Sequence, residues 1–163
     1  ASPGGLGQVD EMDVANAAPP KFVDAMALAA DRDLIALQYA SKFDLVLGEM
    51  AELLELASHR WGWPRGIIHT QMVSLSRRPD TLILRKCGRE TAETVQQRAA
   101  EIVDHVSPDD ETYEQALGDL DFWLRSDGHR RNPGATADLI AGSLFVLLRE
   151  QRIDPRNISG EEV

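Results

Sequence analysis

Three side chains that can carry positive charge lie immediately before a predicted helix start near the C-terminus. His129, Arg130 and Arg131 are followed by Asn132-Pro133-Gly134, and a carboxylate comes shortly afterwards at Asp138. Asparagine is a good N-cap and proline is favoured at the first helical position, so we expect unpaired backbone N–H groups here. A helix N-terminus attracts anions, and neighbouring arginines strengthen that attraction. The stretch therefore either binds phosphate or only starts a helix beside solvated arginines.

A second basic group surrounds one carboxylate in the middle of the chain. Arg77 and Arg78 precede Asp80, and Arg85 and Lys86 follow it. Arginine forks and lysine point charges could grip a polyphosphate here. In the alternative interpretation, Asp80 only caps the helix that begins at Thr81, and the basic residues complement the dipole near its C-terminus.

Other candidate residues give weaker signals. Asp31-Arg32-Asp33 precedes a long helical pattern, where acidic residues are expected for capping. Carboxylates two positions apart on a helix do not face the same way, so this pair alone is a poor metal site. His69 lies in a mostly apolar helix, a setting more typical of a packed histidine than of a catalytic one. The sequence contains no nucleotide-binding P-loop and no dinucleotide glycine fingerprint.

The elements that carry these residues are predicted to be helical throughout. Apolar residues recur at helical spacing in six segments, and the short Thr81–Leu84 stretch between two of them is predicted to be helical as well. The six segments are 22–29, 34–54, 67–75, 95–106, 113–124 and 139–148. The last segment is apolar on most sides, which predicts a helix at the centre of the molecule with Ile140, Leu144, Leu147 and Leu148 buried. We therefore expect an all-α, multi-helix bundle with an apolar central C-terminal helix.

The length of 163 residues fits one domain with a full hydrophobic core. Residues 1–20 form a predicted irregular lead-in, 21–152 a helical domain and 153–163 a polar tail. Twenty-seven acidic against seventeen basic residues give a net charge of −10, which argues against non-specific nucleic-acid binding. No apolar run approaches the roughly 20 residues of a membrane span. One cysteine, Cys87, allows no intramolecular disulfide, and we expect a cytoplasmic protein.

The same stretches, in this order, resemble the triphosphoribosyl-dephospho-CoA synthase family. The most specific match is Asn132-Pro133-Gly134-Ala135-Thr136-Ala137-Asp138-Leu139, which is close to a family signature. The other matching stretches are Gly4–Gly7 with Asp13–Ala15, Ala29–Asp33, and Pro79–Gly88. Together they span nearly the whole chain.

The resemblance implies a transferase that joins ATP to 3′-dephospho-CoA. The 2′-hydroxyl of the acceptor would attack C1 of the ATP ribose and release adenine, with inversion at that carbon. This implies a base, cations on the triphosphate and a Mg²⁺ ion that shares its charge. Asp80 and Asp138 are then the candidates for base or metal ligand. The residues expected to bind phosphate or nucleotide are Arg85, Lys86, Arg130, Arg131, Asn132, Gly134 and Thr136, with Asp31, Arg32 and His69 as further candidates.

Two departures from the family pattern leave alternatives open. Family members are usually longer, so the chain resembles their C-terminal half, and we expect the missing N-terminal half to be a partner. Leu82 follows Asp80-Thr81 where the decarboxylase-linked members typically have asparagine. This difference is compatible with a related ribosyl transferase in another cofactor pathway. A third possibility is a helical module that binds nucleotide without catalysis.

Overall fold

The computed structural model describes residues 21–154, and within that range it contains helices and no strand. The all-α prediction is therefore confirmed. The helices are α1 (Phe22–Ala27), α2 (Leu34–Ala40), α3 (Asp44–Leu47), α4 (Glu49–Trp61), α5 (Trp63–Arg77), α6 (Thr81–Cys87), α7 (Arg89–His105), α8 (Thr112–Arg125) and α9 (Gly134–Arg149). The predicted lead-in and all of the tail after Asp154 lie outside the described residues, as do the Gly4–Gly7 and Asp13–Ala15 stretches.

The long apolar pattern of residues 34–54 forms three helices instead of the single predicted one. Lys42 and Phe43 have left-handed backbone angles, with φ of 60° and 65°, and they end the run of α2. The buried side chain of Gln38 accepts a hydrogen bond from the backbone N of Val46 at 3.3 Å. This bond pairs a backbone N–H group at the start of α3 that has no partner within the helix. The edge of the Tyr39 ring meets Phe43 with centroids 5.0 Å apart. The break at Lys42 and Phe43 thus carries no glycine or proline signal, whereas the break between α3 and α4 falls at Gly48.

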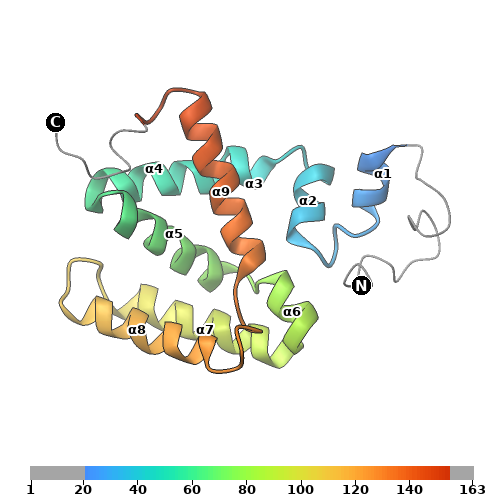
Figure 1. Cartoon of the computed structure of the whole chain (residues 1–163). Coiled ribbons are helices and arrows are strands. Elements are labelled where there is room, and N and C mark those ends of the chain that lie inside the picture. Colours follow the sequence, from blue (N-terminus) through green and yellow to red (C-terminus); the bar gives the residue numbers. More distant parts are fainter. Residues whose placement is uncertain (1–20, 155–163) are drawn as a thin grey trace.

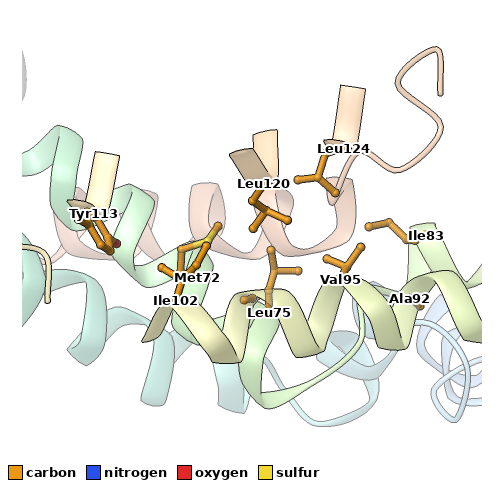
Figure 2. Packing of buried hydrophobic residues seen from close by; sticks show 10 residues of the cluster. Met72, Leu75, Ile83, Ala92, Val95, Ile102, Tyr113, Leu120 and Leu124 are labelled. Carbon is orange, nitrogen blue, oxygen red and sulfur yellow. The ribbon is translucent and has the colours of Figure 1, made fainter. Parts of the chain in front are cut away.

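Two groups of buried apolar residues form the core. One lies among α5, α6, α7 and α8, where Figure 2 shows Leu120 of α8 turned toward Met72 and Leu75 of α5. The other lies among α3, α4 and α9 and includes Leu54 and Leu139. Helix α5 joins them, because it packs against α4 and α9 on one side and α7 on the other. In Figure 1, α9 crosses α4 and α5, while α7 and α8 lie together beneath α5.

Helix α9 packs against the core with one face and exposes another. Ile140 and Leu147 are buried, and Leu144 and Leu148 are partly buried against the α3–α4–α9 core, as the apolar pattern predicts. Phe145 is 63% exposed, however, so the prediction of a helix surrounded on most sides is wrong for the face that carries it. Ile153 was assigned to the polar tail but is buried in the same core, so the helical domain extends at least one residue further. None of the helices in residues 21–154 is long and apolar enough to cross a membrane.

Candidate functional site

The N-termini of α2, α6 and α9 meet at one place in the fold. The backbone N of Leu34, at the start of α2, donates to Oγ1 of Thr81 at the start of α6, 3.1 Å away. The backbone N of Thr136, in the first turn of α9, donates to Oδ2 of Asp80 at 2.7 Å. Three of the stretches that matched in sequence, around residues 33, 80 and 134, are therefore neighbours in space. Figure 1 shows α6 beside the start of α9.

Asp80 connects α6 to α9 through both of its carboxylate oxygens. Oδ1 accepts from the backbone N of Leu82 at 2.9 Å and of Ile83 at 3.1 Å, which caps α6. Oδ2 accepts from the backbone N of Thr136 and from its Oγ1 at 2.8 Å. The residue is 0% exposed. A carboxylate with four protein donors and no access to solvent is suited to hold helices together, so this geometry gives no support to the catalytic and metal-binding roles expected of Asp80.

The start of α9 differs from the predicted phosphate cradle. Thr136 is buried, and Asp80 already accepts from its N–H and its hydroxyl. A Cβ at Gly134 would lie 2.6 Å from Cδ2 of Leu82, so the absent side chain leaves room for leucine. Residue 133 occupies the N-cap position without a side-chain cap, so the prediction that Asn132 caps this helix is wrong. The backbone N–H of Thr136 is therefore used by Asp80, and that of Gly134 donates to the backbone O of Asn132 at 2.9 Å, so neither is free to bind a phosphate.

Cations gather instead along the exposed side of α6. Nη1 of Arg85 lies 3.2 Å from Oδ2 of Asp33, whose other oxygen caps α2. Nη2 of Arg130 donates to the backbone O of Lys86 at 3.0 Å and so fixes the loop before α9 against the end of α6. Lys86 is exposed, and its ammonium makes no hydrogen bond or ion pair to any of residues 21–154. The structure thus brings together three of the predicted phosphate ligands, Arg85, Lys86 and Arg130.

Arg131 has a different role from Arg130. Its Nη1 donates to the backbone O of Trp123 at 3.0 Å and to Oγ of Ser126 at 3.2 Å. Its guanidinium also lies over the Trp123 ring, 4.3 Å from the centroid, and Arg98 lies over the same ring at 4.3 Å. Arg131 therefore clamps the loop 126–133 to α8. No sequence signal pointed to this clamp, because a tryptophan eight residues before an arginine implies no contact across a loop.

Asp31 and Arg32 lie in the turn before α2, close to the residue that pairs with Arg85. Nη1 of Arg32 donates to the backbone O of Leu28 at 2.8 Å and lies 3.2 Å from Oδ1 of Asp31. The Nε atom of Arg32 is buried and has no hydrogen-bond partner within the described chain. Arg32 therefore supports this turn and still has one unused donor.

Asp138 is an exposed carboxylate in the first two turns of α9. It follows Thr136 on α9, and within residues 21–154 its side chain makes no hydrogen bond or ion pair. No group of three acidic, histidine or cysteine side chains that could hold a metal occurs among these residues. Mg²⁺ in phosphate sites commonly needs only one or two protein carboxylates, with waters and substrate oxygens completing the shell. Asp138 fits that requirement, whereas Asp80 does not.

His69 contacts none of these residues. Its Nδ1 lies 3.3 Å from the hydroxyl of Tyr113, and its ring meets the edge of Trp61 with centroids 4.7 Å apart. Burial and the charge of Arg60 lower the pKa of His69. Burial raises the pKa of Tyr113, although Arg65 opposes that shift. His69 is a packed, neutral histidine on α5 that lies between Trp61 of α4 and Tyr113 of α8, as its apolar surroundings in the sequence indicated.

Within residues 21–154, the fold defines a helical protein in which three helix starts meet, with exposed cations on α6 and in the loop before α9. A model of the CitG family, described as ATP:dephospho-CoA triphosphoribosyl transferase, matches residues 1–157. The chain belongs to this family. No curated protein and no solved structure matches it. The missing N-terminal half stays a prediction, and a match over nearly the whole chain weighs mildly against it.

Proposed function

We propose that this chain transfers the triphosphoribosyl group of ATP to the 2′-hydroxyl of 3′-dephospho-CoA and releases adenine. The observation that carries the proposal is the contact of Arg130, in the loop that leads to α9, with the backbone of the exposed Lys86, together with the exposed carboxylate of Asp138, which pairs with no group among residues 21–154. The family description names the same donor and acceptor.

Lys86 and Arg130 would bind the triphosphate. Both are exposed, and Arg130 uses one of its five N–H groups on the backbone of Lys86. The net charge of the chain is −10, so an anionic substrate needs a local group of cations such as this one. Arg85 would contribute less, because Asp33 already neutralises much of its charge.

The reaction makes one bond and breaks one bond at the ribose C1 of ATP. The acceptor oxygen bonds to this carbon and loses its proton, while the bond to the adenine nitrogen breaks and its electron pair leaves with adenine, which takes up a proton. Positive charge develops on the ribose in the transition state, as in glycoside hydrolysis. Asp138 would accept the acceptor's proton or hold Mg²⁺. When bound, Mg²⁺ would supply positive charge that offsets the charge of the triphosphate.

The direct test is adenine release from ATP by the purified chain with dephospho-CoA and Mg²⁺, followed by chromatography and by the mass of the product. Asp138→Asn should reduce turnover far more than it weakens ATP binding, because it removes a charge used in the reaction step. Asp104→Asn, an exposed acid at the far end of α7, is the matched control. Equal turnover in wild type and Asp138→Asn would exclude the proposed role of Asp138.

The two other functions suggested by the sequence are outcomes of the same assay. Release of adenine only with a different acceptor would identify a related ribosyl transferase. Binding of ATP without release in the presence of any acceptor would identify a non-catalytic module. The structure weakens the argument from Leu82 for a different acceptor, since that side chain packs against Gly134 and so has a role in the fold.

A further inference from the structure

A pocket of about 570 Å³ opens between α5, α8 and the loop that leads to α9. Its apolar walls include Met72, Leu120 and Leu124, which belong to the core cluster drawn in Figure 2. Pro133, which precedes α9, lies on another side of the pocket. The volume falls within the range of about 300–1,000 Å³ that is usual for small-molecule sites.

Apart from His129, the polar side chains that line this pocket are uncharged or paired with each other, which suits a neutral ligand group. Asp121 and Arg125 form an ion pair at 2.8 Å and so offset each other's charge. Gln71 and Asn132 also line the pocket, and their side-chain amides make no hydrogen bond within residues 21–154. Each amide offers donors and an acceptor, and this combination can pair with N6 and N7 of adenine.

We propose that this pocket binds the adenine ring of a nucleotide. The apolar walls would cover the faces of the ring, and Gln71 and Asn132 would bind its edge. The inference rests on the proposed function, because ATP and dephospho-CoA both carry adenine. It adds a second binding region that neither the family match nor the sequence motifs assigned, apart from Asn132 itself.

The loop 126–133 connects this pocket to the cations on α6. Asn132 lines the pocket, whereas Arg130, two residues earlier, contacts the backbone of Lys86. Arg131, which lies between Arg130 and Asn132 in the sequence, holds the loop to α8. The loop therefore borders both regions. A nucleotide whose base occupies the pocket would extend its phosphates along this loop toward Lys86 and Arg130.

Gly118 gives a way to fill the pocket without disturbing the core. It lines the pocket from α8, and a Cβ added there meets no atom within 4 Å. Its φ lies outside the left-handed region, so a larger residue fits the helix. Gly118→Leu should fill part of the pocket while the thermal unfolding temperature stays at or above that of wild type. Gln115→Leu places the same side chain on the exposed surface of α8 and is the matched control.

The experiment measures binding of ATP, ITP and dephospho-CoA to the purified chain by calorimetry. ITP lacks the N6 amine, so wild type should prefer ATP. Gly118→Leu should weaken ATP or dephospho-CoA binding by about tenfold or more, and Gln71→Ala should reduce the preference for ATP over ITP by a similar factor. Gln115→Leu should match wild type. The ligand that Gly118→Leu weakens identifies whose adenine occupies the pocket.

Failure of this inference differs from failure of the proposed function. Unchanged binding of ATP and dephospho-CoA by folded Gly118→Leu and Gln71→Ala would overturn the pocket assignment, even if wild type releases adenine. Adenine-selective binding that both variants weaken, without release of adenine from ATP, would support the pocket and contradict the transferase. A wild-type chain that binds none of the three nucleotides would overturn both.

Discussion

The carboxylate of Asp80 accepts both the backbone N–H and the hydroxyl of Thr136, at 2.7 and 2.8 Å. These residues are 56 positions apart, and the same carboxylate caps the helix that begins at Thr81. Two helix starts thus depend on one buried anion. The signature stretch Asn132–Leu139 is therefore held in place by a buried side chain of the preceding helix start.

Removal of this carboxylate should destabilise the protein. Asp80→Ala loses the cap of α6 and leaves buried donors of Thr136 unpaired, so we expect the free energy of unfolding to fall by about 2–4 kcal/mol. Urea denaturation followed by circular dichroism measures this change. Thr136→Ser, which keeps the hydroxyl, should have a much smaller effect. A stable Asp80→Ala that has lost only turnover would instead assign Asp80 to catalysis.

Substitution of Gly134 should create an internal clash that Leu82 can relieve. Gly134→Ala places its Cβ 2.6 Å from Cδ2 of Leu82, and overpacking of this kind costs about 1–3 kcal/mol. Leu82→Ala made in the same chain should recover part of the loss. A double-mutant cycle on thermal unfolding gives the coupling between the two positions. Additive effects would show that α6 and α9 do not meet at these residues.

The two adjacent arginines should respond differently to truncation. Arg130→Ala should weaken ATP binding by about 1.5–3 kcal/mol with little effect on stability, because Arg130 is exposed and is a proposed phosphate ligand. Arg131→Ala should lower the free energy of unfolding by about 1–3 kcal/mol, because it removes the contacts with Trp123. Calorimetry and thermal denaturation of each variant separate the two effects. The reverse pattern would contradict both assignments.

The neutral state of His69 should make stability depend on pH. Its pKa in the folded protein is below the ordinary value of 6.5 because of burial and Arg60. As pH falls through about 6.5, the unfolded chain takes up a proton that the folded chain resists, so the free energy of unfolding decreases. The difference between wild type and His69→Gln, measured by denaturation from pH 8 to pH 5, should isolate this contribution. A difference that is constant with pH would show that His69 titrates normally.

Helical periodicity predicted much of the fold because it reports which residues face inward. Val95, Ala99 and Ile102 on α7, and Tyr113 and Leu120 on α8, are buried as their spacing indicates. Periodicity did not reveal the break at Phe43, because neither glycine nor proline marks it and the hydrogen bond of Gln38 with the backbone N of Val46 leaves no pattern in the sequence. Prediction from the sequence was therefore most successful for helices such as α7 and α8, in which the spacing of apolar residues determines which face is buried.

For the candidate site, the sequence identified stretches whose helix starts meet in the fold, but not all the contacts of their residues. In the alternative interpretation of the sequence Asp80 caps α6, and its Oδ1 does so. Its second oxygen reaches α9, a contact that no local signal encodes. The sequence likewise predicts the same role for Arg131 and Arg130. The structure distinguishes them, because the guanidinium of Arg131 lies over the Trp123 ring. The pocket beside Gln71 was missed because its walls come from three segments, each of which has an ordinary sequence.

The double role of Asp80 also affects how the native protein opens locally. If hydrogen exchange proceeds by local opening, an opening that displaces Asp80 exposes the amides of Leu82, Ile83 and Thr136 together, because all three donate to this residue. The first turns of α6 and α9 then form a single cooperative unit, although more than fifty residues separate them in the chain. Loss of Asp80 from the start of α6 would therefore also expose the amide of Thr136 in the signature segment.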